Sequence, residues 1–197
     1  DVPAALPEED SPAPPEPTAA LHSSDDEAAE TDPAAEPESE SAAGAGFRHF
    51  GFCAELMRGI EEAGFQTPTP IQEKAIPELM AGRDLIGQAL TGTGKTAAFG
   101  LPAMEKLRGT SGLQLLVLVP TRELAAQVSS ELFKLGRYTG LHTAAFTGGQ
   151  SYTRQERMLS KGINALVATP GRLIDLIELG HFREVNPSFI VVDEADE

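Results

Sequence analysis

Eight consecutive residues, Ala89-Leu90-Thr91-Gly92-Thr93-Gly94-Lys95-Thr96, carry the clearest chemical signal in this chain. Gly92 and Gly94 let the backbone curl so that successive N–H groups point at phosphate oxygens. A helix-compatible stretch follows, and the partial positive charge at its N-terminus favours the same anion. Lys95 would reach the outer phosphates, and the Thr96 hydroxyl would bind Mg²⁺. The segment therefore predicts a P-loop that holds a nucleoside triphosphate.

A second signal stands near the end of the sequence, where an apolar run at 189–192 leads into Asp193-Glu194-Ala195-Asp196. Ligands of an open parallel sheet bind at the carboxyl ends of its strands. Asp193 therefore belongs at the same sheet edge as the P-loop, where it can hold Mg²⁺ through water. Glu194 can orient and polarise an attacking water. An acidic tetrapeptide alone is usually a solvated turn, but beside a P-loop it indicates hydrolysis of a nucleoside triphosphate.

The elements that must position these residues form an alternating pattern of apolar runs and amphipathic stretches, which is typical of a parallel α/β sheet flanked by helices. The expected strands are 84–87, 113–119, 141–146, 164–168 and 189–192. The expected helices are a stretch from the P-loop to about Leu107, then 122–135, 152–160 and 172–179. The dinucleotide fingerprint G-x-G-x-x-G is absent, which argues against a nicotinamide or flavin enzyme.

Composition divides the 197 residues into two parts. Residues 1–46 hold 13 of the 30 Asp and Glu residues and no Lys or Arg, so they carry −13 of the net charge of −15. Such a segment cannot bury enough apolar surface to offset its ordering entropy, and we expect a disordered acidic tail. Residues 47–197 are nearly neutral and fit one domain of ordinary size.

Cysteine content and hydropathy bear on the compartment. Cys53 is the only cysteine, so no internal disulfide can form, and we expect a reducing, cytoplasmic environment. No apolar run approaches the ~20 residues of a membrane span. We expect a monomer that does not associate with membranes.

Further motifs, met in order along the chain, resemble the DEAD-box RNA helicases, and most closely their bacterial members. Residues 64–72 resemble the family's adenine-recognition motif, with the isolated aromatic Phe47 standing 17 positions upstream of Gly64. Residues 89–96 match the family's form of the P-loop, which has alanine at position 89, and residues 193–196 are the tetrapeptide that names the family. Residues 120–125, 148–149 and 169–172 resemble its RNA-contacting motifs.

The resemblance implies a role for each matching residue. Lys95, Asp193 and Glu194 would be catalytic, Asp196 would couple two domains, and Thr96 and Asp193 would hold Mg²⁺, largely through water. The residues implied in ATP binding are Phe47, Phe65, Thr67, Gln72, Ala89, Leu90, Thr91, Gly92, Thr93, Gly94, Lys95 and Thr96. Those implied in RNA binding are Thr121, Arg122, Gly148, Gly149, Thr169, Pro170, Gly171 and Arg172.

Elementary chemistry supports these roles and leaves alternatives open. The amide of Gln72 can read adenine N6 and N7 as a bidentate pair, and Phe47 can stack on the base, which is typically worth about 1–3 kcal/mol. Alternatively, Phe47 begins the core and Gln72 is a solvent-facing helix residue. Arg122 can pair with a carboxylate of its own helix, and Thr169–Arg172 can be a helix-entry turn.

The RNA motifs each follow an expected strand and open the next helix or loop. Free N–H groups, a Thr hydroxyl and an Arg at a helix N-terminus make a site for backbone phosphates. Such contacts position RNA without reading its bases, so we expect little sequence preference.

The resemblance implies an N-terminal RecA-like domain of an ATP-dependent RNA helicase, incomplete here because the family's later strands and second RecA-like domain are not in the sequence. Alone, the chain is expected to bind adenine nucleotide weakly and to hydrolyse it slowly, since the second domain supplies arginine fingers worth about 10³–10⁵ in rate. An ATP-gated RNA clamp and a P-loop ATPase acting on DNA or protein are the alternatives. The acidic tail is expected to be a solvating spacer or a docking segment for a basic protein.

Overall fold

A four-stranded parallel sheet organises the part of the chain that the structure describes, residues 46–182 and 185–196 of the computed structural model. The acidic segment expected at 1–46 lies outside these residues except for Gly46. The strands are β1 (Leu115–Leu118), β2 (Thr143–Phe146), β3 (Ala165–Ala168) and β4 (Phe189–Val192). Their order across the sheet is β2-β3-β1-β4, and each neighbouring pair is parallel.

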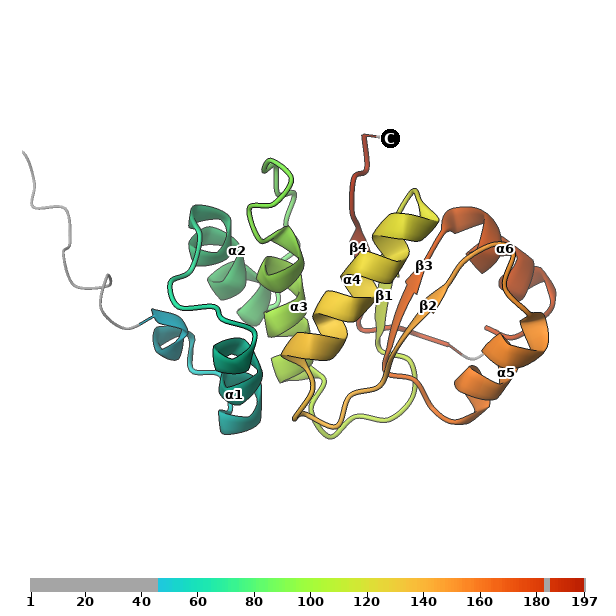
Figure 1. Ribbon diagram of the computed structural model, residues 1–197, viewed down its shortest axis with the longest axis horizontal. Helices are drawn as coiled ribbons and strands as arrows, with labels where there is room; N and C mark the ends of the chain where they lie inside the picture. Colours follow the sequence, from blue (N-terminus) through green and yellow to red (C-terminus); the bar gives the residue numbers. More distant parts are fainter. Residues whose placement is uncertain (1–45, 183–184, 197) are drawn as a thin grey trace, which may run out of the picture. The chain divides into compact units, whose positions relative to one another are not determined.

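Helices cover both faces of this sheet, because the side chains of a strand alternate between its two faces. The helical elements are η1 (Gly46–Phe50), α1 (Ala54–Glu62), α2 (Pro70–Met80), α3 (Lys95–Lys106), α4 (Arg122–Leu135), α5 (Tyr152–Ser160) and α6 (Pro170–Glu178). In Figure 1, α1, α2 and α3 lie to the left of the sheet, and α5 and α6 lie to its right.

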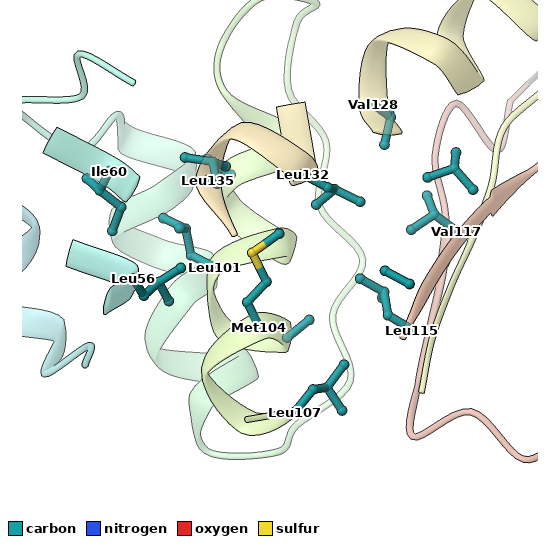
Figure 2. Packing of buried hydrophobic residues seen from close by; sticks show 14 of the residues in the cluster. Leu56, Ile60, Leu101, Met104, Leu107, Leu115, Val117, Val128, Leu132 and Leu135 are labelled. Atoms are coloured by element: carbon teal, nitrogen blue, oxygen red, sulfur yellow. The ribbon is translucent and has the colours of Figure 1, made fainter. Parts of the chain in front are cut away.

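The larger core joins α1, α3 and α4 to one face of β1. Leu115 and Val117 of β1 point into it, and Figure 2 shows them facing Met104 of α3 and Leu132 of α4. The two helices approach closely, since a Cβ on Gly100 would lie 2.6 Å from Leu132 Cδ2. This core therefore fixes α4 against the helix that follows the P-loop.

The smaller core lies on the opposite face, under α5 and α6. Leu166, Leu173 and Leu176 are buried there, with Leu116 and Leu118 packed against them. The register pairs these last two residues with Ile190 and Val192 of β4. Both β4 side chains remain exposed, at 63% and 58%, so α5 and α6 do not cover the β4 end of this face.

The parallel direction of the strands places all four carboxyl ends at one edge of the sheet. The sequence motifs of the chain directly follow those ends. They are residues 120–122 after β1, 148–149 after β2, 169–172 after β3 and 193–196 after β4.

The expected helices at 122–135 and 152–160 and the expected strand at 189–192 are confirmed with these bounds. The expected strands at 113–119, 141–146 and 164–168 are confirmed in shorter form, and the helix expected at 172–179 runs from Pro170 to Glu178.

The strand expected at 84–87 is wrong, because this segment has no regular structure. Leu85 is 43% exposed and Ile86 is fully exposed. A cavity of about 730 Å³ is lined by this segment and by β4, and the segment is not paired with any of the four strands. Two apolar residues between Asp84 and Gly87 are too few to hold a strand without such a partner.

Replacing Leu132 with alanine should lower the free energy of unfolding by about 2–5 kcal/mol, because it opens a cavity between α3, α4 and β1. Urea denaturation followed by circular dichroism measures the loss. Phe133→Ala is the matched control, since Phe133 is the next residue on α4 and is 57% exposed. An equal loss in both variants would contradict this account of the core.

Candidate nucleotide site and nucleic-acid groove

The P-loop residues form a tight turn between the irregular segment at 83–90 and α3. Gly92 and Gly94 have φ of 78° and 85°, a left-handed conformation that glycine adopts without strain. The Thr93 hydroxyl donates to the carbonyl of Leu90 at 2.7 Å, which closes the turn. Ala89 is half-buried, and Thr91 lies exposed at the turn itself.

The backbone N–H groups at this turn are available to an anion. Lys95 and Thr96 open α3, whose first helical hydrogen bond runs from Ala98 N to Gly94 O at 3.1 Å. Within the described residues, the N–H groups of 92–97 donate to no protein acceptor. The start of α3 therefore presents the free donors and helix dipole that a polyphosphate requires.

Gln72 supports the P-loop through a buried hydrogen bond to its backbone. Its side chain is fully buried, its Nε2 donates to Gly94 O at 3.1 Å, and its Oε1 accepts from Thr69 N at 2.9 Å. A Cβ on Gly94 would lie 2.3 Å from Gln72 Nε2, so this close contact also requires glycine at position 94. The alternative of a solvent-facing Gln72 is wrong, since both ends of the amide are engaged inside the protein.

Thr69 is a second support for the loop that sequence reasoning did not single out. Its hydroxyl donates to Thr93 O at 2.8 Å, and it forms a capping box with Gln72 at the start of α2. The pattern Thr-x-x-Gln before a helix is the signal that could have found it. Thr67, which the resemblance places in the ATP site, is exposed, whereas Thr69 contacts the loop.

Phe47 and Phe65 pack in the core. Phe47 is 2% exposed, and its ring lies edge-on to Phe65 with centroids 6.0 Å apart. Stacking on adenine requires an open ring face, which Phe47 in this conformation does not present. The arrangement matches the alternative in which Phe47 begins the core, and base stacking by this ring remains a prediction that needs η1 to move.

The residues that follow β4 meet the P-loop at the sheet edge. Lys95 Nζ lies 3.9 Å from Asp193 Oδ1, and their side chains are 25% and 11% exposed. Among the described residues, Glu194 is the one non-glycine residue with positive φ, at 52°. Such strained backbone concentrates at functional sites. Asp196 is exposed, and its role in coupling domains stays a prediction.

Glu131 of α4 is a half-buried carboxylate beside this pair that the motifs did not indicate. Burial raises the pKa of its carboxyl, and the nearby charge of Asp193 adds to the rise. Contacts with the Thr96 hydroxyl and the Lys134 ammonium oppose it. A polar residue on the inward side of a helix otherwise patterned for the core was the available signal.

The residues predicted to bind RNA line a separate groove at the same sheet edge. It encloses about 590 Å³ and is lined by Pro120, Thr121, Arg122, Glu123, Gly148, Thr169, Gly171, Arg172 and Asp175. The groove thus brings together three motifs that follow β1, β2 and β3. Pro170 is the first residue of α6, and Gly149 lies beside Arg122.

Arg122 lies directly against the glycine pair that follows β2. Cβ atoms on Gly148 and Gly149 would lie 3.2 Å and 3.0 Å from its guanidinium nitrogens. Thr121 caps α4, its hydroxyl accepting from Leu124 N at 3.2 Å. Arg122 makes no ion pair within the described residues, so the structure does not show the alternative of a carboxylate partner on its own helix.

The guanidinium of Arg172, in contrast, is buried and bound by other groups of the protein. Its side chain is 3% exposed, Nε donates to Gln155 Oε1 at 2.7 Å, and a terminal nitrogen donates to Gln150 O at 2.8 Å. Its guanidinium also lies 3.4 Å from the ring centroid of Tyr152. Arg172 therefore connects α6 to α5 and forms part of the wall of the groove.

The fold and the site together define a P-loop nucleotide-binding domain with an adjoining groove, and comparison with known proteins agrees. The DEAD/DEAH box helicase family matches residues 69–197. The chain is 46% identical over 151 residues to the DEAD-box ATP-dependent RNA helicase RhpA of Helicobacter pylori, with 77% of this chain and 31% of RhpA covered. It is 49% identical over 152 residues to CshA of Geobacillus kaustophilus, with 77% and 32% covered.

A solved structure gives the same result. The chain resembles the crystal structure of a hypothetical ATP-dependent RNA helicase from Sulfolobus tokodaii, with a TM-score of 0.66 and 37% identity. The likeness covers 72% of this chain and 41% of that one. The chain belongs to the DEAD/DEAH box helicase family, and it spans about a third of the length of the relatives RhpA and CshA.

Glu131→Gln should raise the melting temperature of the nucleotide-free chain at pH 7.5. The pKa of Glu131 is raised in the folded chain. The protonated carboxyl therefore makes its full contribution to stability below the ordinary Glu pKa of about 4.3, and this contribution is lost as the pH rises through the pKa of the folded state. The charged carboxylate therefore costs stability at neutral pH, and the gain in Glu131→Gln should shrink as pH falls toward 5.

Differential scanning fluorimetry between pH 5 and 8 measures this gain. Glu178→Gln, which changes an exposed residue of α6, is the control. It should change the free energy of unfolding by less than about 0.5 kcal/mol at each pH, and the melting temperature correspondingly little. A gain that does not vary with pH in Glu131→Gln would contradict the assignment.

Proposed function

We propose that this chain is the ATP-binding, RecA-like part of an ATP-dependent RNA helicase. The observation that carries the proposal is the 3.9 Å approach of Lys95 to Asp193 at a sheet edge that also bears the groove of the three RNA motifs. Nucleotide and RNA would then share one edge, so that cleavage of ATP could be linked to RNA binding. RhpA and CshA are themselves described as DEAD-box ATP-dependent RNA helicases.

The P-loop residues would bind the phosphates of ATP. The free N–H groups of 92–97 and the dipole of α3 would attract the phosphates, and Lys95, whose side chain is 25% exposed, would supply a cation. Gln72 would read adenine only if its amide exchanges the contacts with Gly94 and Thr69 for the base edge. Adenine recognition would thereby be linked to the conformation of the phosphate loop.

The oxygen donors at this site suit Mg²⁺, which prefers hard oxygen ligands and keeps several waters. The Thr96 hydroxyl and the Asp193 carboxylate would hold the ion, with Glu131 behind Thr96. When bound, the ion would supply positive charge to the phosphate oxygens. Glu194 would orient the attacking water, with its backbone fixed by a hydrogen bond from its N–H to Asp193 Oδ1 at 3.1 Å.

RNA would lie in the groove with its phosphates toward Arg122, Thr121 and the N-terminus of α6. Arg122 is exposed and unpaired within the described residues, which suits a phosphate contact. Arg172 is buried and would support the groove from within the protein. Contacts of this kind carry little sequence preference.

The remaining expectations concern the surroundings of the chain. No helix of residues 46–182 or 185–196 is long and apolar enough to cross a membrane. We propose that the protein is monomeric and cytoplasmic. Its residues 1–46 would serve as a spacer or as a docking segment, and their charge of −13 suits docking to a basic partner.

Nucleotide binding provides the first test of the ATP site. Lys95→Ala should weaken binding of a non-hydrolysable ATP analogue at least about tenfold, because a charge-assisted phosphate contact is lost. Isothermal titration calorimetry on the chain measures this, and Lys161→Ala, an exposed lysine after α5, should leave affinity unchanged. Equal affinity for ATP and GTP analogues would contradict adenine recognition through Gln72.

ATP turnover tests the coupling of the two sites. In the chain extended to the length of its relatives, single-stranded RNA should stimulate ATP hydrolysis, and Glu194→Gln should reduce the stimulated rate at least about 100-fold while ATP still binds. A phosphate-release assay measures both. Turnover indifferent to RNA would reduce the assignment to a P-loop ATPase of another substrate.

A further inference from the structure

Tyr152 contacts two of the residues that line the groove proposed for RNA. It is the first residue of α5, three positions after Gly149, and the residue is 41% exposed. Its hydroxyl donates to Asp175 Oδ2 at 3.1 Å, and the Arg172 guanidinium lies 3.4 Å from its ring centroid. Asp175 and Arg172 both line the groove, so the ring is fixed to the groove wall by two contacts.

These contacts orient the ring without burying it. Arg172 occupies one face of the ring, and Tyr152 as a whole remains 41% exposed to solvent. The hydroxyl bond to Asp175 restrains rotation of the side chain. An aromatic ring that is held in place and still open to solvent loses little conformational entropy when another flat group stacks on it.

We propose that Tyr152 is a stacking platform for one base of the single-stranded RNA whose backbone lies in the groove. The inference rests on the proposed function and adds a base contact to its backbone contacts. Every nucleobase has a π face, so stacking of this kind adds affinity while tolerating any sequence. The cation behind the ring strengthens the platform, because Arg172 is itself held by Gln150 and Gln155.

The competing explanation is that Tyr152 serves only to pack against Arg172. The two roles separate in matched variants of the same position. Tyr152→Phe keeps the ring and loses the hydroxyl bond to Asp175, whereas Tyr152→Leu keeps apolar bulk and loses the π face. Tyr138→Leu is the distant control, since Tyr138 follows the C-terminal end of α4 and the groove lies at its N-terminal end, about 20 Å away.

The test uses the chain extended to the length of its relatives and measures binding of a fluorescein-labelled single-stranded oligouridylate by fluorescence anisotropy, with a non-hydrolysable ATP analogue present. We expect Tyr152→Leu to bind about tenfold more weakly, and Tyr152→Phe and Tyr138→Leu to bind within about twofold of the wild type. A second series moves one abasic site along the oligonucleotide. One position should weaken binding by the wild-type chain about tenfold and should have no further effect in Tyr152→Leu.

The abasic series needs no substitution in the protein, so it remains informative even if a Tyr152 variant folds poorly. Wild-type binding that is insensitive to every abasic position overturns the stacking role while leaving the proposed function intact. An abasic loss that persists in Tyr152→Leu overturns it equally, since the stacked base would lie elsewhere. Absence of RNA binding by the chain extended to the length of its relatives overturns the proposed function, and the stacking role with it.

Discussion

The parallel direction of the four strands is the constraint on which the functional arrangement depends. In a parallel sheet every strand ends at the same edge, so each segment that follows a strand is delivered to one surface. Residues 120–122, 148–149, 169–172 and 193–196 are far apart in the sequence and meet there for this reason alone. An antiparallel pairing of any strand would have sent its motif to the opposite side of the molecule.

The P-loop is held by side-chain hydrogen bonds instead, because no strand precedes it in this structure. Gln72 and Thr69 bind the carbonyls of Gly94 and Thr93, and these two contacts join the start of α2 to the turn before α3. The loop thus takes its shape from the segment that is also expected to recognise adenine. A base that engaged Gln72 would alter the support of the phosphate loop, which gives a physical link between recognition of the nucleotide and placement of its phosphates.

The two arginines of the groove show how burial separates residues that a motif treats alike. Arg122 lies exposed against two glycines, whose lack of side chains lets the guanidinium approach the backbone. Arg172 is enclosed by Gln150, Tyr152 and Gln155 and makes contacts that a phosphate would have to replace. The first is suited to touching a ligand and the second to holding the elements that surround it, including the ring of Tyr152.

The sequence by itself determined the fold class, the bounds of α4, α5 and β4, and the chemistry of residues 89–96 and 193–196, because hydrophobic period and local glycine pattern are properties of short segments. Local pattern misplaced a strand at 84–87, where pairing depends on a partner and none of the four strands supplies one. Only the tertiary structure decided that Gln72, Phe47 and Arg172 are buried. It also brought Glu131 to Thr96 and set Tyr152 on Arg172. Burial and contact depend on residues distant in sequence, and no spacing within one segment encodes them.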